Sequence, residues 1–377
     1  MVAALAMNDN RGNFAAGHGH PARHAGSHRV PNASPRGNPR SPSRNESRMP
    51  NTSMDTLRRI NPVRFVERGV RDPEAERGAL VAGLRATPAA IPPQYFYDAV
   101  GCALYGAICE LPEYYPTRTE RAIFRAHRDA IVAAAGRGGQ LVDLGAGDCG
   151  KAQAWLPLLA PARYVAVDFA GDAIRKALAQ MAPEFPEVAM TGIVADFTRG
   201  LDLEGELDAG PVTFFYPGSS IGNFAPADAL LFLRDIHRHC IGRERSGLLI
   251  GVDTKKDKAR LDAAYDDAVG VTAAFNRNVL RHVNRLLGSD FRPDAFAHRG
   301  YYNAEAGRVE MHLEAITEQT VRLPGATRTF AAGERIHTEN SWKYAPEQFT
   351  ALLTDAGFRR VHCWQDDARD FAVFHAA

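Results

Sequence analysis

The sequence has few cysteines, no long apolar run and almost no net charge. Its five cysteines are scattered over 377 residues without a CxxC spacing, which favours a reducing compartment over a disulfide framework. No apolar run approaches the roughly 20 residues that cross a bilayer. The formal net charge is +1, so no general field attracts nucleic acid or an anionic membrane. We therefore expect a cytoplasmic protein that binds no nucleic acid, membrane or metal.

The N-terminal segment has almost no acidic residues and no sustained hydrophobic periodicity. Residues 1–58 are rich in Gly, Pro, Ser, Asn, Arg and His and cannot bury enough apolar surface to offset the entropy of ordering. We predict a disordered tail. Its composition is also typical of an organellar transit peptide, although no amphipathic stripe is visible. An upstream-extended reading frame is an alternative, since Met49 and Met54 stand where order should begin.

The middle of the chain alternates short apolar runs with helical segments. Five runs end in turn residues: 140–144, 164–167, 188–194, 212–216 and 247–252. This alternation predicts an α/β fold with a parallel sheet of βαβ units. Ligands bind such sheets beyond the carboxyl ends of the strands. A helix over 119–135, with Thr119 as its N-cap, should precede the first strand.

The alternation stops after Asp253. Further expected elements are a helical stretch over 259–287, strands at 297–303, 308–316, 321–323 and 334–339, a helix over 346–356, and an antiparallel edge hairpin from 361–364 and 370–375. Residues from about 57 to 84 look helical. We predict a smaller α+β substrate-binding domain from 59–117 and 256–342. The α/β domain would then comprise 118–255 and 343–377.

A glycine loop, LVDLGAGDCGKA over 141–152, follows the first of these strands. Gly145, Gly147 and Gly150 form G-x-G-x-x-G, and Asp168 ends the next strand. This spacing is the fingerprint of a dinucleotide-binding enzyme, so a nicotinamide-dependent oxidoreductase is one interpretation.

Acidic residues around the loop favour a different adenosine cofactor. Asp143 and Asp148 disfavour a pyrophosphate at a helix N-terminus, whereas Asp143 can accept hydrogen bonds from an ammonium group. Asp196-Phe197 ends the third strand, and its carboxylate can accept from an adenine amine, with the ring stacked on an aromatic or apolar neighbour. Asp168 suits ribose hydroxyls in either case, and Lys151 could reach a carboxylate. The pattern favours S-adenosylmethionine.

Several strings together resemble the histidine Nα-methyltransferases of ergothioneine biosynthesis. They are FYD (96–98), LPEYYPTR (111–118), GSSIGNF (218–224), YDDAVGVTAAFN (265–276), VEMH (309–312) and IHTENS (336–341). The resemblance runs from about residue 60 to the C-terminus. It implies a Rossmann-like class I methyltransferase sheet, parallel with an antiparallel C-terminal edge, and the smaller substrate-binding domain. It also implies three methyl transfers from S-adenosylmethionine to the α-amine of L-histidine, giving hercynine and S-adenosylhomocysteine.

The resemblance also implies roles for particular residues. Cofactor contacts fall at Gly145, Lys151, Asp168, Asp196 and Phe197, to which the loop pattern adds Asp143 and Gly147. Substrate contacts fall at Tyr97 and Gly218 near the amine, Asn223 and Tyr265 on the carboxylate, Tyr114, Glu339 and Ser341 on the imidazole, and Met311 packed on that ring. Tyr97 is the candidate catalytic residue, because it can orient the amine lone pair.

The residue types at the imidazole make chemical sense by themselves. An imidazole presents one N–H and one lone pair, which a carboxylate acceptor and a hydroxyl can satisfy together. Methylation of another amino acid, such as tryptophan or a derivative, is the main alternative, although an indole lacks the second polar nitrogen. A non-catalytic binding protein that retains the pocket is a further alternative. We expect a monomer, because no surplus apolar stripe is evident.

Overall fold

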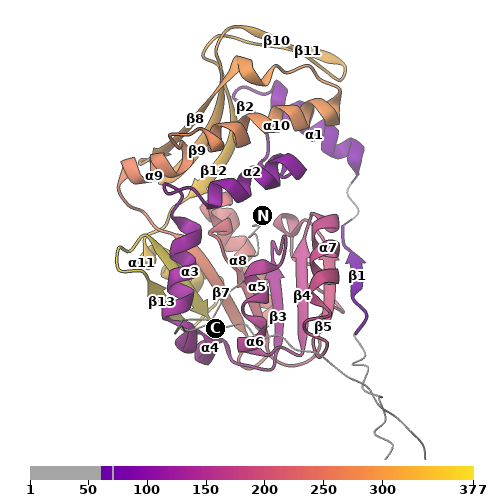
Figure 1. Cartoon of the computed structure of the whole chain (residues 1–377), viewed down its shortest axis with the longest axis vertical. Coiled ribbons are helices and arrows are strands. Elements are labelled where there is room, and N and C mark those ends of the chain that lie inside the picture. The colour runs from indigo at the N-terminus through magenta and orange to yellow at the C-terminus, as the bar shows by residue number, and fades with distance from the viewer. Residues whose placement is uncertain (1–60, 70–71) are drawn as a thin grey trace, which may run out of the picture. The chain divides into compact units, whose positions relative to one another are not determined.

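Buried apolar strands build a large mixed sheet in the computed structural model, which describes residues 61–69 and 72–377 (Figure 1). The predicted tail, 1–58, lies outside these residues. The strand order is β1 (Arg64–Glu67), β5 (Ala189–Val194), β4 (Arg163–Asp168), β3 (Gln140–Leu144), β6 (Val212–Tyr216), β7 (Gly247–Asp253), β14 (Phe371–Ala376) and β13 (Val361–Gln365). The strands from β1 to β7 are parallel, and β14 runs antiparallel between β7 and β13. The predicted fold class is confirmed.

Helices cover both faces of this sheet. The two faces carry separate apolar cores. One face packs against α8 (Pro226–Cys240) and α11 (Pro346–Ala356). The other packs against α3 (Pro116–Ala126), α4 (Arg128–Ala135), α6 (Leu156–Leu159) and α7 (Gly171–Met181). Strands buried on both faces are mostly apolar, and β7 is buried at every position.

The strand order reverses beside β3. The chain proceeds from β3 to β4 and β5 on one side, then crosses to β6 and β7 on the other. A reversal of this kind opens a crevice at the carboxyl ends of the two strands that flank it. The loops after β3 and β6 border that crevice, so the fold places the glycine loop and the segment around Asn223 together.

A second set of elements, which we call the cap, has its own apolar core. Its sheet has the order β2 (Ala89–Ala90), β12 (Arg335–Trp342), β9 (Arg308–Ala315) and β8 (Phe296–Asn303). Its remaining elements are α1 (Pro73–Arg85), the 3-10 helix η1 (Pro93–Phe96), α2 (Ala99–Cys109), α9 (Lys258–Tyr265), α10 (Val271–Leu287), η4 (Pro293–Ala295) and the hairpin β10 (Gln319–Leu323) and β11 (Ala326–Phe330). The described residues form one compact unit, so the cap packs on the large sheet.

Several predicted boundaries are wrong. The helix predicted over 119–135 begins at Pro116, a residue suited to the first helical turn, and is interrupted at His127. Residues 64–67, predicted to be helical and placed in the substrate-binding domain, form β1 and pair with β5. The single helical stretch predicted over 259–287 is two helices, α9 and α10. The irregular segment between them ends at Gly270, which has a φ of 79°. The strand β11 was not predicted. Within the described residues, no helix has both the length and the apolar character to span a membrane.

Candidate active site

The glycine loop turns sharply as it leaves β3. Gly145 and Gly147 have φ values of 70° and 56°, and Cys149 is also left-handed at 59°. The Gly145 N–H donates to the Val167 carbonyl of β4 at 2.8 Å, which ties the loop to the neighbouring strand. The short helix α5 (Gly150–Gln153) follows at once. The strand, tight turn and helix that a G-x-G-x-x-G motif requires are therefore present.

Two carboxylates at the ends of β3 and β4, Asp143 and Asp168, are buried and hydrogen-bonded beside this loop. Asp168 accepts from the N–H of Gly147 at 3.0 Å and of Ala170 at 2.8 Å, and burial raises its pKa. Asp143 accepts from the Tyr164 hydroxyl at 2.8 Å, and burial raises its pKa to about 7. Asp168 therefore holds the loop directly, whereas Asp143 ties β3 to β4.

Asp196 and Phe197 differ in what they present to a ligand. Asp196 caps the 3-10 helix η2 (Phe197–Arg199) by accepting from the Thr198 N–H at 3.2 Å, and it borders a cavity that Arg68 and Arg199 also line. The ring of Phe197 is 1% exposed and stacks on Phe232. An adenine therefore cannot stack on this ring.

Lys151 is held by a buried carboxylate that the sequence analysis missed. Its Nζ donates to Glu120 Oε2 at 2.7 Å, and the other oxygen of Glu120 accepts from the Gly218 N–H at 2.6 Å. Glu120 is 1% exposed. A Cβ at Gly251 would lie 2.0 Å from this carboxylate, so glycine in β7 makes room for it. Glu120 thus links α3, the glycine loop and the loop after β6.

One cavity collects every residue predicted to bind the substrate. Its lining includes Tyr97, Tyr114, Gly218, Asn223, Tyr265, Met311, Glu339 and Ser341. Gly218 and Asn223 belong to the loop after β6, and the others belong to the cap or to the link between α2 and α3. The cavity therefore lies where cap and large sheet meet. Asn223 also borders a second cavity with Thr198, in the direction of Asp196.

A β-bulge aims β12 into this cavity. The pairing of β12 with β9 shifts register between His337 and Glu339, so that Glu339 stands opposite Met311. A bulge changes which face of a strand the following side chains occupy. Beyond the bulge, Glu339 and Ser341 share the face that lines the cavity, together with Met311. Periodicity alone could not have predicted this change of face.

Gly222 brings the two halves of the cavity together. It belongs to the 3-10 helix η3 (Ser220–Asn223). A Cβ at Gly222 would lie 2.8 Å from the Trp342 carbonyl oxygen and 3.3 Å from Ser341 Oγ. Only glycine allows η3 to approach β12 this closely, and this approach places Asn223 and Ser341 on one cavity.

Burial dominates the electrostatics of the cavity. It raises the pKa of Glu339 to about 7, against a smaller lowering by Lys343. Burial also raises the pKa of Tyr97 well above its usual value, with Glu339 adding to the effect. Tyr97 is therefore a neutral hydroxyl at physiological pH, which supports an orienting role and disfavours a phenolate base.

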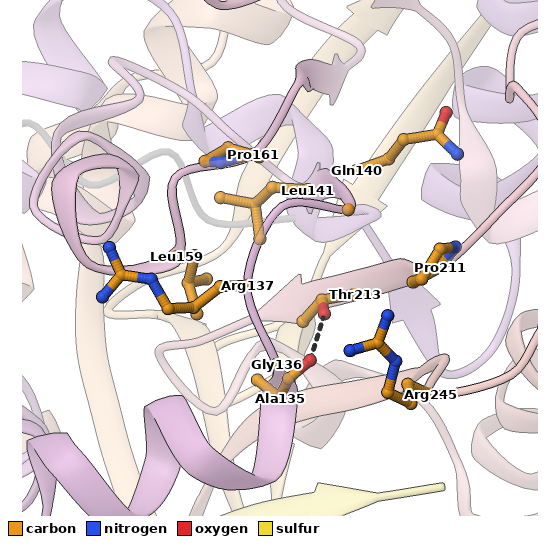
Figure 2. Close-up of a pocket in the computed structure, with 11 residues that line it drawn as sticks. Ala135, Gly136, Arg137, Gln140, Leu141, Leu159, Pro161, Pro211, Thr213 and Arg245 are labelled. Carbon is orange, nitrogen blue, oxygen red and sulfur yellow. Dashed lines mark hydrogen bonds between the residues drawn. The ribbon is translucent and has the colours of Figure 1, made fainter.

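A different cavity lies at the other end of the large sheet (Figure 2). Its lining includes Gln140 and Leu141, which begin β3, and Arg137 and Arg245 from nearby loops. A hydrogen bond of 3.4 Å joins the Thr213 hydroxyl to the Ala135 carbonyl there. Active sites of parallel sheets lie at the carboxyl ends of the strands, so this cavity is not the candidate active site.

The groups at the carboxyl edge fit S-adenosylmethionine. The left-handed loop allows close backbone approach, Lys151 supplies a cation for a carboxylate, and Asp196 borders open space beyond the third strand. With the adjoining amino-acid cavity, the fold and site define an S-adenosylmethionine-dependent methyltransferase.

Comparison with known proteins specifies the family. Residues 76–377 match the family described as histidine-specific methyltransferase, SAM-dependent, and the chain belongs to it. It is 42% identical to the histidine N-alpha-methyltransferase of Mycolicibacterium smegmatis, over 80% of this chain and 94% of that protein. Identity to the Mycobacterium tuberculosis enzyme is 40%, over 80% and 95%. Ergothioneine biosynthesis protein 1 of Neurospora crassa is 30% identical over 74% of this chain and 32% of that longer protein. The predicted family, cofactor and enzyme class are confirmed.

Proposed function

We propose that this protein transfers three methyl groups from S-adenosylmethionine to the α-amine of L-histidine, giving hercynine, as the first step of ergothioneine biosynthesis. The observation that carries the proposal is the single cavity lined by all eight predicted substrate residues. All eight come from one chain. The division into a substrate-binding and a cofactor-binding part is included in the proposal, with β1 reassigned to the large sheet.

The imidazole end of the cavity favours histidine over other amino acids. Glu339 can accept one imidazole N–H, Ser341 can serve the other nitrogen, and the thioether of Met311 can pack on the ring. An indole offers no second polar nitrogen. Tryptophan would therefore leave a buried polar group unpaired, at a cost of about 1–3 kcal/mol. Sites built this way discriminate strongly against analogues that lack the matching polar atom.

The amine end of the cavity favours alignment over covalent catalysis. When bound, S-adenosylmethionine supplies an electrophilic methyl group on a sulfonium. Holding the amine in line with that methyl group is the main contribution the protein can make. The neutral Tyr97 hydroxyl can hydrogen-bond the amine, and Gly218 lines the cavity on the amine side. Asn223 and Tyr265 provide uncharged donors for the carboxylate.

Mass spectrometry of the product tests the proposal. With S-adenosylmethionine and L-histidine, we expect three successive mass gains of one CH₂ each, and no comparable gain with L-tryptophan. Tyr97→Phe should slow every transfer while leaving S-adenosylhomocysteine binding unchanged by calorimetry. Methylation of tryptophan in preference to histidine would support the alternative substrate. Binding of both ligands without turnover would identify a non-catalytic protein.

A further inference from the structure

A buried lysine lies directly behind the candidate histidine site. Lys343 follows β12, and its side chain is 0% exposed. Its Nζ lies 2.9 Å from the Tyr265 hydroxyl oxygen, 2.8 Å from Ser341 Oγ and 2.7 Å from Asp253 Oδ2. Two of these three partners are residues to which the proposed function gives substrate contacts.

Counting donors and acceptors fixes the direction of each hydrogen bond. An ammonium group has three donors and no acceptor, and Lys343 has three oxygen partners. Both hydroxyl oxygens must therefore accept from Lys343. The Tyr265 hydroxyl also donates to Ser341 Oγ at 2.9 Å. The Ser341 oxygen then accepts twice, which uses both of its lone pairs, and its own proton remains for a ligand.

The charge of Lys343 is secured by a buried carboxylate. Asp253 is fully buried between Lys343 and Lys256, whose Nζ lies 2.5 Å from Asp253 Oδ1. Burial opposes the charge on each group. Nevertheless the two lysines hold the pKa of Asp253 below its usual value, and Asp253 holds the pKa of Lys343 above its usual value. Lys256 serves the same carboxylate but contacts Tyr115 and the Thr254 carbonyl instead of the cavity hydroxyls.

The position of Tyr265 is fixed independently of Lys343. The Tyr265 carbonyl accepts from His298 Nε2 at 2.8 Å, and Asn276 donates to the other ring nitrogen, also at 2.8 Å. This arrangement defines the neutral tautomer of His298. Replacing Lys343 should therefore change whether the Tyr265 hydroxyl donates or accepts hydrogen bonds, without displacing α9.

We propose that Lys343 is a positioning residue that, by donating to the hydroxyl oxygens of Tyr265 and Ser341, directs the protons of both hydroxyls toward the bound amino acid. This inference rests on the proposed function. Once histidine is bound, Tyr265 can redirect its proton to the substrate carboxylate. Ser341 then donates to the imidazole lone pair, while Glu339 accepts the N–H of the other nitrogen. The network thereby selects a neutral imidazole whose lone pair accepts from Ser341. By binding both the carboxylate and the imidazole of the substrate, it also orients the amine.

The test compares Lys343→Met with Lys256→Met, because both variants remove one cation from the same carboxylate. Histidine affinity is measured by calorimetry on the full chain saturated with S-adenosylhomocysteine, and S-adenosylhomocysteine affinity is measured separately. We expect Lys343→Met to weaken histidine binding about 10- to 100-fold, the range for one or two charge-assisted hydrogen bonds. Lys256→Met should change it by less than about 3-fold, and neither variant should alter S-adenosylhomocysteine binding. Lys343→Arg should recover part of the loss.

Two outcomes would overturn the inference: unchanged histidine affinity in Lys343→Met, or an equal loss in Lys256→Met. If Lys343→Met does not fold, Asp253→Asn is compared with Asp253→Asn/Lys343→Met, because both then lack the buried carboxylate. Equal histidine affinity in this second pair would also refute the role of Lys343. A wild-type protein that does not bind histidine would contradict the proposed function itself, which is a distinguishable result.

Discussion

Glu339→Ala is the sharpest test of the imidazole assignment. The bulge in β12 aims this carboxylate into the cavity opposite Met311. Without it, a buried imidazole N–H would lose its acceptor, at a cost of about 1–3 kcal/mol. Since 1.4 kcal/mol corresponds to a factor of ten, kcat/KM for histidine should fall about 10- to 100-fold. The affinity for S-adenosylhomocysteine should stay within about 2-fold, because the cofactor loop lies on other elements.

Steady-state kinetics and calorimetry on the same preparations measure both quantities. Glu314→Ala is the matched control, because Glu314 lies on the adjacent strand β9 and its carboxylate is bonded to Arg299 and Arg335 instead of the cavity. It should retain wild-type kcat/KM. Equal losses of histidine turnover and cofactor affinity in Glu339→Ala would refute the reasoning, and so would an unchanged kcat/KM.

Three further predictions concern pH, cofactor and packing. Burial raises the pKa of Glu339 from 4.5 to about 7, so the folded state holds this proton more tightly than the unfolded chain. Stability is therefore lost as pH rises from about 4.5 to 7. In denaturant unfolding, the free energy of unfolding of Glu339→Gln should be larger than that of wild type at pH 8, by at most about 3 kcal/mol, but not at pH 4. Lys151→Met should weaken S-adenosylhomocysteine binding about 10-fold in calorimetry, whereas unchanged binding would contradict a carboxylate contact. Gly222→Ala should lower the free energy of unfolding by about 1–3 kcal/mol and weaken histidine binding, because the alanine Cβ would lie 2.8 Å from the Trp342 carbonyl oxygen. Unchanged stability and histidine affinity would show that η3 can move away from β12.

The sequence predicted the central strands well because parallel strands are buried on both faces. The runs at β3, β4, β6 and β7 are apolar nearly throughout, and no neighbour is needed to identify them. β1 is different. Its sequence, RFVE, is short and half polar, and it becomes a strand only by pairing with β5. The same reason explains the missed β11, which pairs only with β10 at the edge of the cap.

The substrate residues could be predicted because long motifs carry them, whereas their supporting residues could not. Glu120 meets Lys151, and Lys343 meets Asp253, only through tertiary packing. No spacing in the sequence indicates either ion pair. Lys343 does follow Glu339 and Ser341 in steps of two, which is typical of one strand face. However, the face itself depends on the bulge, so the pattern becomes informative only with the structure.

The two supporting ion pairs share a physical logic. Lys151 and Lys343 both approach the site, since a Cβ at Gly218 would lie 2.9 Å from Lys151 Nζ and Lys343 contacts Ser341. Unpaired, they would repel a cationic sulfonium, because charges interact strongly at low dielectric. Lys151 is instead paired with the buried Glu120, and Lys343 shares the buried Asp253 with Lys256. The carboxylates keep the N–H donors in place and offset part of the positive charge. A site that must position a carboxylate beside a sulfonium benefits from fixed donors whose charge is partly offset.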